Sequence, residues 1–137
     1  PPYKFEAGTQ NLSGTPTLIP ALETARDMRA VDTDIVRDYM LDSLRSDPRI
    51  TLYGVPRRTE DKVPVFSFSV EGAHHEDLAL ILDKMGIAVR SGQMCAEPLM
   101  DRFGVTGMVR ASFAPYNTLQ EAEYFISCLD RAIKMLV

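Results

Sequence analysis

An apolar stripe close to the C-terminal end of the sequence constrains the fold more than any other feature. The stripe recurs at helical spacing and consists of Leu119, Ala122, Ile126, Leu129, Ile133 and Leu136. Thr118 precedes it, and Glu121 follows three residues later, which is the capping-box pattern of a helix N-terminus. A helix with one apolar face buries that face against another layer, so this pattern predicts a layered domain.

Helical and strand patterns alternate through the rest of the sequence. The second helix is expected to bury Ile35, Val36, Tyr39, Met40 and Leu44. The expected elements before residue 118 are a helix beginning between Pro16 and Pro20, a helix from Asp32 or Thr33 that ends before Pro48, strands at 50–53 and 65–70, a helix at 75–85, a strand at 87–90, a helix at 96–103 and a strand at 108–113. This order predicts an α+β fold with a mostly antiparallel sheet and helices packed on one face.

The domain organisation follows from length and local composition. Residues 1–15 are rich in Gly, Ser, Thr, Asn and Pro and show little periodicity, which is typical of a linker segment. The chain has 137 residues and is 45% hydrophobic, so it can bury one core. We therefore expect one small α+β domain over residues 16–137 behind a linker.

Charge and cysteine content exclude several classes of protein. The net charge of -4 and the pI of about 5.1 disfavour a nucleic-acid partner. No signal sequence and no apolar run long enough to cross a membrane are present, so no membrane partner is expected. The two cysteines form no CxxC pair, and with His74 and His75 they match no metal-ligand spacing. A cytoplasmic protein without a metal site is predicted.

Cys95 is the candidate reactive residue. It follows a strand pattern and a glycine turn and stands at the start of a short helix. Nearby arginine and a helix N-terminus both stabilise a thiolate, which is the nucleophilic form. A lone cysteine is more commonly a small buried hydrophobe. Arg90, Gly92 and Pro98 around it favour the reactive thiol.

Two blocks around this cysteine carry a resemblance to a known family. The run RSGQMCAEPLM at 90–100, with RASFAPYNT at 110–118, resembles the C-terminal part of pyridoxal-phosphate-dependent cysteine desulfurases and selenocysteine lyases, in the class V aminotransferase superfamily. The segment FEAGTQN at 5–11 is similar to the part that leaves the large cofactor domain. The resemblance covers nearly the whole chain and implies the small C-terminal domain of a fold-type I enzyme.

The resemblance implies a role for four residues. Cys95 corresponds to the nucleophile that forms a persulfide, and Arg110 to the arginine that binds the substrate α-carboxylate. Thr9 corresponds to the residue that reaches the cofactor phosphate of the partner subunit, and Arg90 to a supporting arginine beside the nucleophile loop. Many relatives have histidine before the cysteine, whereas this chain has Gln93 and Met94, which removes a local proton carrier.

The implied activity is the conversion of L-cysteine to L-alanine, with the persulfide on Cys95 passed on to iron–sulfur cluster assembly. The implied partners are the large pyridoxal-phosphate-binding domain of the same enzyme, a second subunit in a homodimer, and a sulfur-acceptor protein. The family's cofactor lysine lies in a Ser/Gly-His-Lys context, which is absent around Lys4, Lys62, Lys84 and Lys134. We therefore expect this chain to bind no cofactor and to be inactive by itself.

Two alternatives to a cysteine desulfurase remain open from the sequence. One is a selenocysteine lyase, which is closely related. The other is a stand-alone interaction or sulfur-carrier module that kept the fold and lost catalysis.

Overall fold

The computed structural model describes residues 8–28 and 31–137. The chain divides into two units, one up to residue 30 and the other from Val31 to Val137. The predicted linker boundary at residue 15 remains a prediction.

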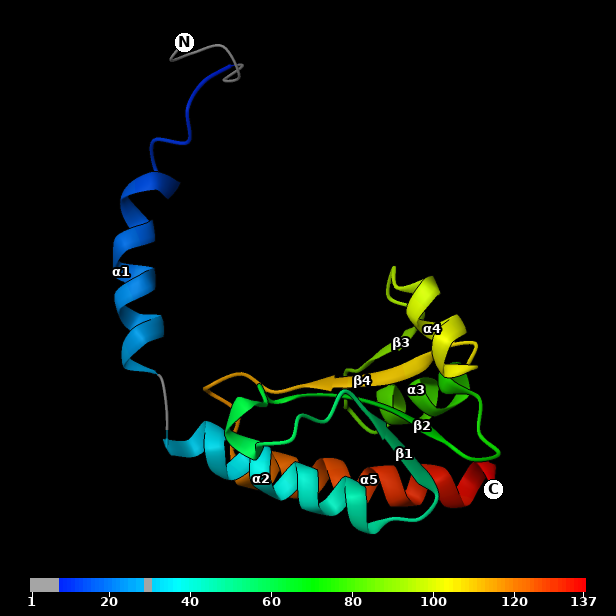
Figure 1. The fold of residues 1–137 in the computed structure, drawn as a ribbon. Helices are drawn as coiled ribbons and strands as arrows, with labels where there is room; N and C mark the ends of the chain where they lie inside the picture. The colour runs from blue at the N-terminus through cyan, green and yellow to red at the C-terminus, as the bar shows by residue number, and fades with distance from the viewer. Residues whose placement is uncertain (1–7, 29–30) are drawn as a thin grey trace. The chain divides into compact units, whose positions relative to one another are not determined.

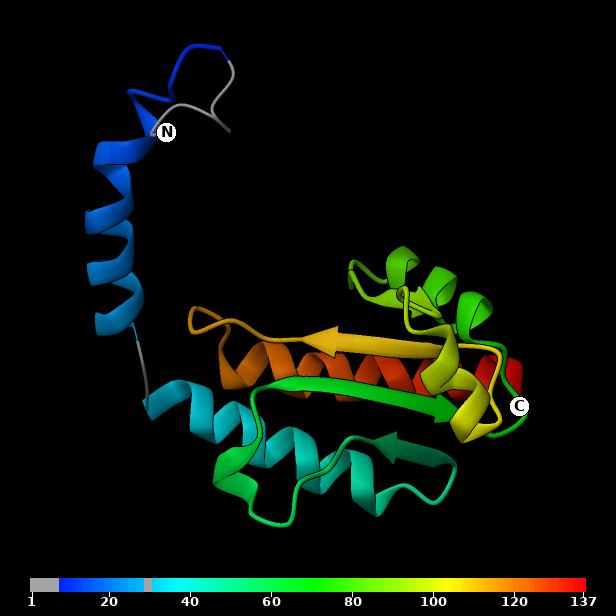
Figure 2. The same ribbon diagram turned by 45° about the horizontal axis from the view of Figure 1, so that its top comes forward.

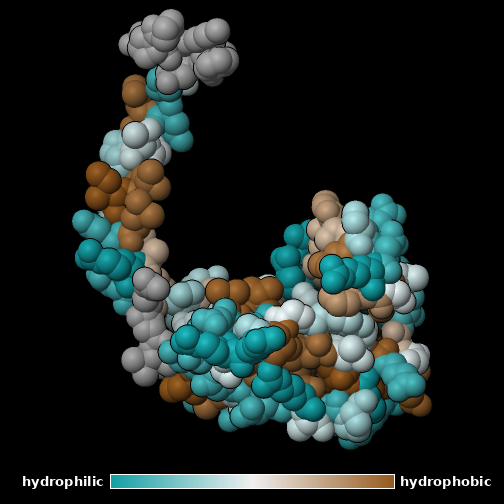
Figure 3. All heavy atoms as spheres, in the orientation of Figure 1, coloured by the Kyte–Doolittle hydropathy of each residue, from teal (hydrophilic) through white to brown (hydrophobic). Residues whose placement is uncertain are grey.

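The first unit contains the helix α1 (Gly14–Asp27). It begins earlier than the predicted start between Pro16 and Pro20, because the side chain of Asn11 accepts a hydrogen bond from the amide of Gly14 at 2.8 Å. Pro16 then lies in the first turn, where a missing amide hydrogen costs little. No residue of α1 is buried. Its exposed apolar side chains include Leu18, Ile19 and Leu22. Figure 3 shows hydrophobic surface along this helix.

The second unit is an α+β domain, as predicted (Figure 1). Its four strands form one sheet in the order β1-β2-β4-β3, and every neighbouring pair is antiparallel. The elements are α2 (Val31–Ser46), β1 (Ile50–Tyr53), the 3-10 turn η2 (Thr59–Asp61), β2 (Val65–Val70), α3 (His75–Lys84), β3 (Arg90–Gly92), α4 (Glu97–Phe103), β4 (Met108–Ser112) and α5 (Leu119–Leu136).

The core lies between the sheet and the three long helices α2, α3 and α5. In β2, Phe66, Phe68 and Val70 alternate with half-buried residues and pack into this core. The short helix α4 instead lies over the opposite face, as Figures 1 and 2 show. Its Phe103 ring lies 4.9 Å from that of Tyr53, between ring centroids. The prediction of helices on one face thus holds for the long helices, and α4 is the exception.

Local signals located most element boundaries in this unit. β1 and β2 have the predicted bounds, and the capping box of α5 is formed, because the Thr118 amide donates to the Glu121 carboxylate at 2.8 Å. β3 begins at Arg90, not at residue 87, because its ladder with β4 starts at that pair. In α2, Ile35 is 46% exposed, contrary to the predicted buried face, and Leu41 is buried.

Within the described ranges, no helix has both the length and the apolar character that a membrane span requires. The described histidine, cysteine and carboxylate side chains also form no cluster of three or more that could hold a metal ion.

Candidate active site

A row of polar side chains crosses the sheet on the face that carries α4. Tyr53 is paired with Ser67, Ser67 with Arg110, and Arg110 with Arg90. Residues directly opposite each other in neighbouring strands point to the same face. The register therefore aligns one residue from each of the four strands, although 57 positions separate Tyr53 from Arg110 (110 − 53).

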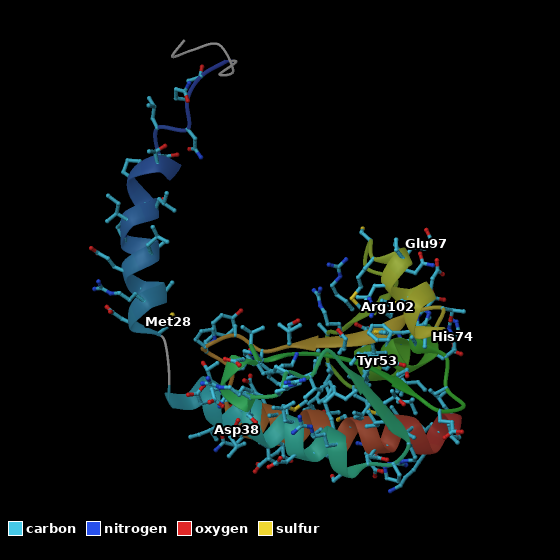
Figure 4. All side chains as sticks on the ribbon, viewed as in Figure 1. Met28, Asp38, Tyr53, His74, Glu97 and Arg102 are labelled. Atoms are coloured by element: carbon cyan, nitrogen blue, oxygen red, sulfur yellow. The ribbon has the colours of Figure 1, made fainter. Side chains whose placement is uncertain are left out.

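A cavity of about 500 Å³ lies between this row and α4. Figure 4 shows Tyr53 beneath α4, the helix that carries the labelled Glu97 and Arg102. The cavity wall is largely apolar, and its charged residues are Lys62 and Arg110. The lining residues are Tyr53, Gly54, Lys62, Val63, Val65, Ser67, Gln93, Met94, Ala96, Leu99, Met100, Phe103, Met108 and Arg110.

Arg110 stands in the middle of β4 and lines this cavity. Its Nε is buried and has no hydrogen-bond partner among the described residues. A buried donor without an acceptor costs roughly 1–3 kcal/mol, and more when the group is charged. A carboxylate from a ligand would satisfy this donor, because a guanidinium fork binds a carboxylate through two parallel hydrogen bonds.

Cys95 lies in the connection from β3 to α4, and its side chain is exposed. Met94 and Cys95 have φ angles of 54° and 62°, two consecutive non-glycine residues in the left-handed region. Such a conformation costs on the order of 1–3 kcal/mol per residue and is most often found at functional sites. Gln93, Met94 and Ala96 line the cavity, so the thiol is carried by the segment that forms the cavity rim.

The other two predicted site residues, Arg90 and Thr9, are not among the residues that line the cavity. Arg90 is exposed and lies directly opposite Arg110, on the outer strand β3. Like charges placed opposite each other in a sheet repel, which a bound anion would offset. Thr9 is exposed and belongs to the first unit, so its role stays a prediction.

Sequence reasoning missed Lys62, Tyr53 and Ser67 as lining residues. The alternation in β2 could have indicated Ser67, since it is a polar residue between two core phenylalanines. Lys62 is half-buried, and its ammonium donates to the carbonyl of Val65 at 2.5 Å. Burial lowers the pKa of Lys62 below its usual 10.5, because the charged form loses hydration. No local pattern marks this lysine.

Several known proteins that are similar in sequence to this chain are named as cysteine desulfurases. The family model for aminotransferase class-V matches residues 1–125. A probable cysteine desulfurase of Xylella fastidiosa is 40% identical, over 99% of this chain and 33% of the relative. The cysteine desulfurase CsdA of Escherichia coli is 37% identical, over 99% of this chain and 34% of the relative.

Solved structures agree with the sequence relatives. The apo structure of cysteine desulfurase from Thermococcus onnurineus superposes with a TM-score of 0.85 at 37% identity, covering 99% of this chain and 34% of that one. The chain thus spans about a third of the length of the relatives it matches. With the family model matching most of its residues, the chain belongs to the class V aminotransferase family.

Proposed function

We propose that this chain is the part of a cysteine desulfurase that supplies the sulfur-accepting thiol and the substrate carboxylate site. The observation that carries the proposal is Arg110, which lines a cavity and whose buried Nε has no hydrogen-bond partner among the described residues; the rim segment of that cavity bears the exposed Cys95. The names of the relatives in Xylella fastidiosa and Escherichia coli supply the substrate, cysteine.

Each residue has a defined task in this reaction. Arg110 binds the α-carboxylate of L-cysteine and fixes its orientation. The thiolate of Cys95 then attacks the substrate sulfur. An S–S bond forms, the C–S bond breaks, L-alanine leaves after its carbon gains a proton, and the persulfide remains on Cys95. Arg90, beside Arg110 in the sheet, is the supporting arginine and adds positive charge on the strand that leads into the nucleophile loop.

None of the lysines stands in the Ser/Gly-His-Lys context in which the family binds pyridoxal phosphate covalently. Lys62 donates to the carbonyl of Val65, Lys134 pairs with Asp130 at 2.6 Å, and Lys84 is exposed at the end of α3. In the proposed whole enzyme the cofactor supplies the electron sink for C–S cleavage. We place its anchor in the large domain, outside this chain.

The remaining parts of the proposal concern the assembly. Residues 1–15 serve as the linker from the large domain, and residues 16–137 form the small domain. The enzyme is a cytoplasmic homodimer in which Thr9 reaches the cofactor phosphate of the partner subunit. A sulfur-acceptor protein receives the persulfide for iron–sulfur cluster assembly.

The substitution Cys95→Ser in the whole enzyme tests the nucleophile. A hydroxyl is a poor acceptor for sulfur and stays protonated near neutral pH, so alanine release from cysteine should be abolished. Selenium departs more readily, so release from selenocysteine should largely persist. The control is Cys128→Ala, which alters the buried cysteine of α5 and should retain activity with cysteine. Continued alanine production from cysteine by the serine variant would refute the proposal.

Arg110→Lys tests the carboxylate site in the same assay. Lysine keeps the charge but loses the planar fork. Because a hydrogen bond to a charged group contributes roughly 1.5–3 kcal/mol, the KM for cysteine should rise about tenfold or more. An unchanged KM would mean that the carboxylate is bound by another residue.

A further inference from the structure

Lys62 is a charged residue of the cavity that the reaction described above does not use. It lies between η2 and β2, outside the blocks that carry the family resemblance. Among the described residues that line the cavity, the charged ones are Lys62 and Arg110, and none is acidic. The cavity therefore carries an excess of positive charge that the described side chains lining it do not balance.

The ammonium of Lys62 is partly committed inside the fold. One hydrogen bond goes to the carbonyl of Val65, and the Phe66 ring centroid lies 5.6 Å away. An ammonium has three donors, so two remain for a ligand. Lys62 forms no ion pair with any residue in the described ranges. The cation is thus held in place by the protein, without a neutralising carboxylate.

The positions along β2 relate this cation to the carboxylate site. Val65, which accepts the hydrogen bond, is two residues from Ser67, the cross-strand partner of Arg110. Two residues of a strand span about 7 Å. Lys62 and Arg110 line the same cavity, so both charges act on an anion bound in it, and at a partly buried site the effective dielectric constant lies below that of water.

We propose that Lys62 is a specificity-determining residue that makes this cavity select substrates with a free carboxylate. This inference rests on the proposed desulfurase function and adds a second cation to its binding site. Arg110 binds the carboxylate directly, and Lys62 strengthens its binding through charge. Burial lowers the pKa of Lys62 because its ammonium loses hydration, and this agrees with the proposed role. A ligand anion beside the ammonium would stabilise the charged form in place of the lost water.

The test compares Lys62→Met, Lys62→Arg and the matched control Lys84→Met in the whole enzyme. Lys84 is exposed at the end of α3 and does not line the cavity. Lys62→Met should raise the KM for L-cysteine about fivefold to tenfold with little change in kcat, because it removes binding common to ground and transition states. Lys62→Arg, which keeps the positive charge, should have a KM for L-cysteine close to that of the parent. Lys84→Met should also leave this KM unchanged.

A neutral substrate isolates the effect of charge. With the amide of cysteine, which lacks the carboxylate charge, Lys62→Met should leave the KM unchanged. An equal increase for the acid and the amide, or an increase for the acid of less than about twofold, would overturn the proposal. These outcomes are separate from loss of the desulfurase function itself, which would appear as alanine release that is independent of Cys95.

The pH dependence supplies a readout that does not require the methionine variant to fold. The other ionisable residues lining the cavity in the described part are Tyr53 on β1 and Arg110 on β4, and both are shared by the parent and Lys62→Arg. As the pH rises toward the lowered pKa of Lys62, the parent should lose affinity for cysteine. Lys62→Arg, which stays charged, should lack this component. Coincident profiles would contradict the proposal.

Discussion

At the scale of single residues, the two cysteines of this chain occupy opposite environments. Cys128 is fully buried in α5, within the hydrophobic core. Cys95 is exposed, in a connection where two successive residues adopt positive φ angles. The sequence pattern agrees with both placements, since Cys128 lies beside the apolar helical stripe and Cys95 follows a glycine turn. Exposure decides which thiol can reach a reagent.

Alkylation kinetics should therefore separate the two thiols. Cys95 should react with iodoacetamide at least about a hundredfold faster than Cys128, because labelling a core residue requires an opening of the fold. Timed quenching and peptide mass spectrometry would measure both rates in the folded chain. In denaturant the two rates should converge, which provides the control. Faster labelling of Cys128 in the folded chain would contradict this assignment.

At the scale of elements, α5 is the helix that contributes the largest group of buried residues to the core. Its N-terminus is fixed by reciprocal hydrogen bonds, in which the Thr118 amide donates to the Glu121 carboxylate and the Glu121 amide donates to the Thr118 hydroxyl. The backbone amide of Thr118, followed by the Asn117 side chain, holds the pKa of Glu121 below its usual 4.5. The buried residues of this helix are Ala122, Phe125, Cys128, Leu129, Ala132 and Ile133.

Loss of this cap should destabilise the whole domain. Thr118→Ala should lower the free energy of unfolding by about 1 kcal/mol, and Thr118→Ser should recover most of it, since serine also caps helices. The control is Ser127→Ala, an exposed change in the middle of the same helix. Urea unfolding followed by circular dichroism would measure all three. Equal stability of the parent and Thr118→Ala would contradict a structural role for the cap.

The same cap predicts a pH dependence of stability. A carboxylate whose pKa is lowered by folding contributes its full stabilisation above its unfolded-state pKa and loses it as the pH falls through the folded-state pKa. The contribution of Glu121 should therefore be complete above about pH 4.5 and decline on further acidification. In Glu121→Gln, the decline of stability below this pH should be smaller than in the parent. Identical acid profiles would contradict this assignment.

At the scale of the whole chain, the distribution of lysines limits what these residues can do alone. No lysine has the Ser/Gly-His-Lys context of the family, and the described lysines are engaged in a carbonyl contact, paired with a carboxylate, or exposed on a helix. The charged side chains that line the cavity are both cationic, which suits them to binding a carboxylate.

This chain by itself should thus release no alanine from cysteine, even with added pyridoxal phosphate. Borohydride reduction followed by peptide mapping should reveal no stoichiometric adduct at any single lysine. A low level of labelling spread over several lysines is nonspecific and serves as the background for this measurement. One fully modified lysine accompanied by alanine release would contradict this expectation.

Short stretches of sequence predict many of the helices and strands of this fold. The capping box, the alternation in β2 and the glycine with positive φ that ends α4 are signals within a few residues, so they can be recognised without knowledge of any long-range contact. The start of β3 was wrong by three residues, from 87 to 90, because pairing with β4 decides where that strand begins. The early start of α1 reflects the Asn11 side chain, which the proline positions did not indicate.

The sequence by itself determined the α+β class, the place of Cys95 just before the short helix α4 and, through the motifs at 90–100 and 110–118, the family. Tertiary structure alone decided that Tyr53, Ser67 and Arg110 stand in one row and that Lys62 shares their cavity. The physical reason is that strand register joins residues far apart in the chain and sets which face each side chain occupies. A shift of one residue in that register would turn Arg110 into the core and remove the site.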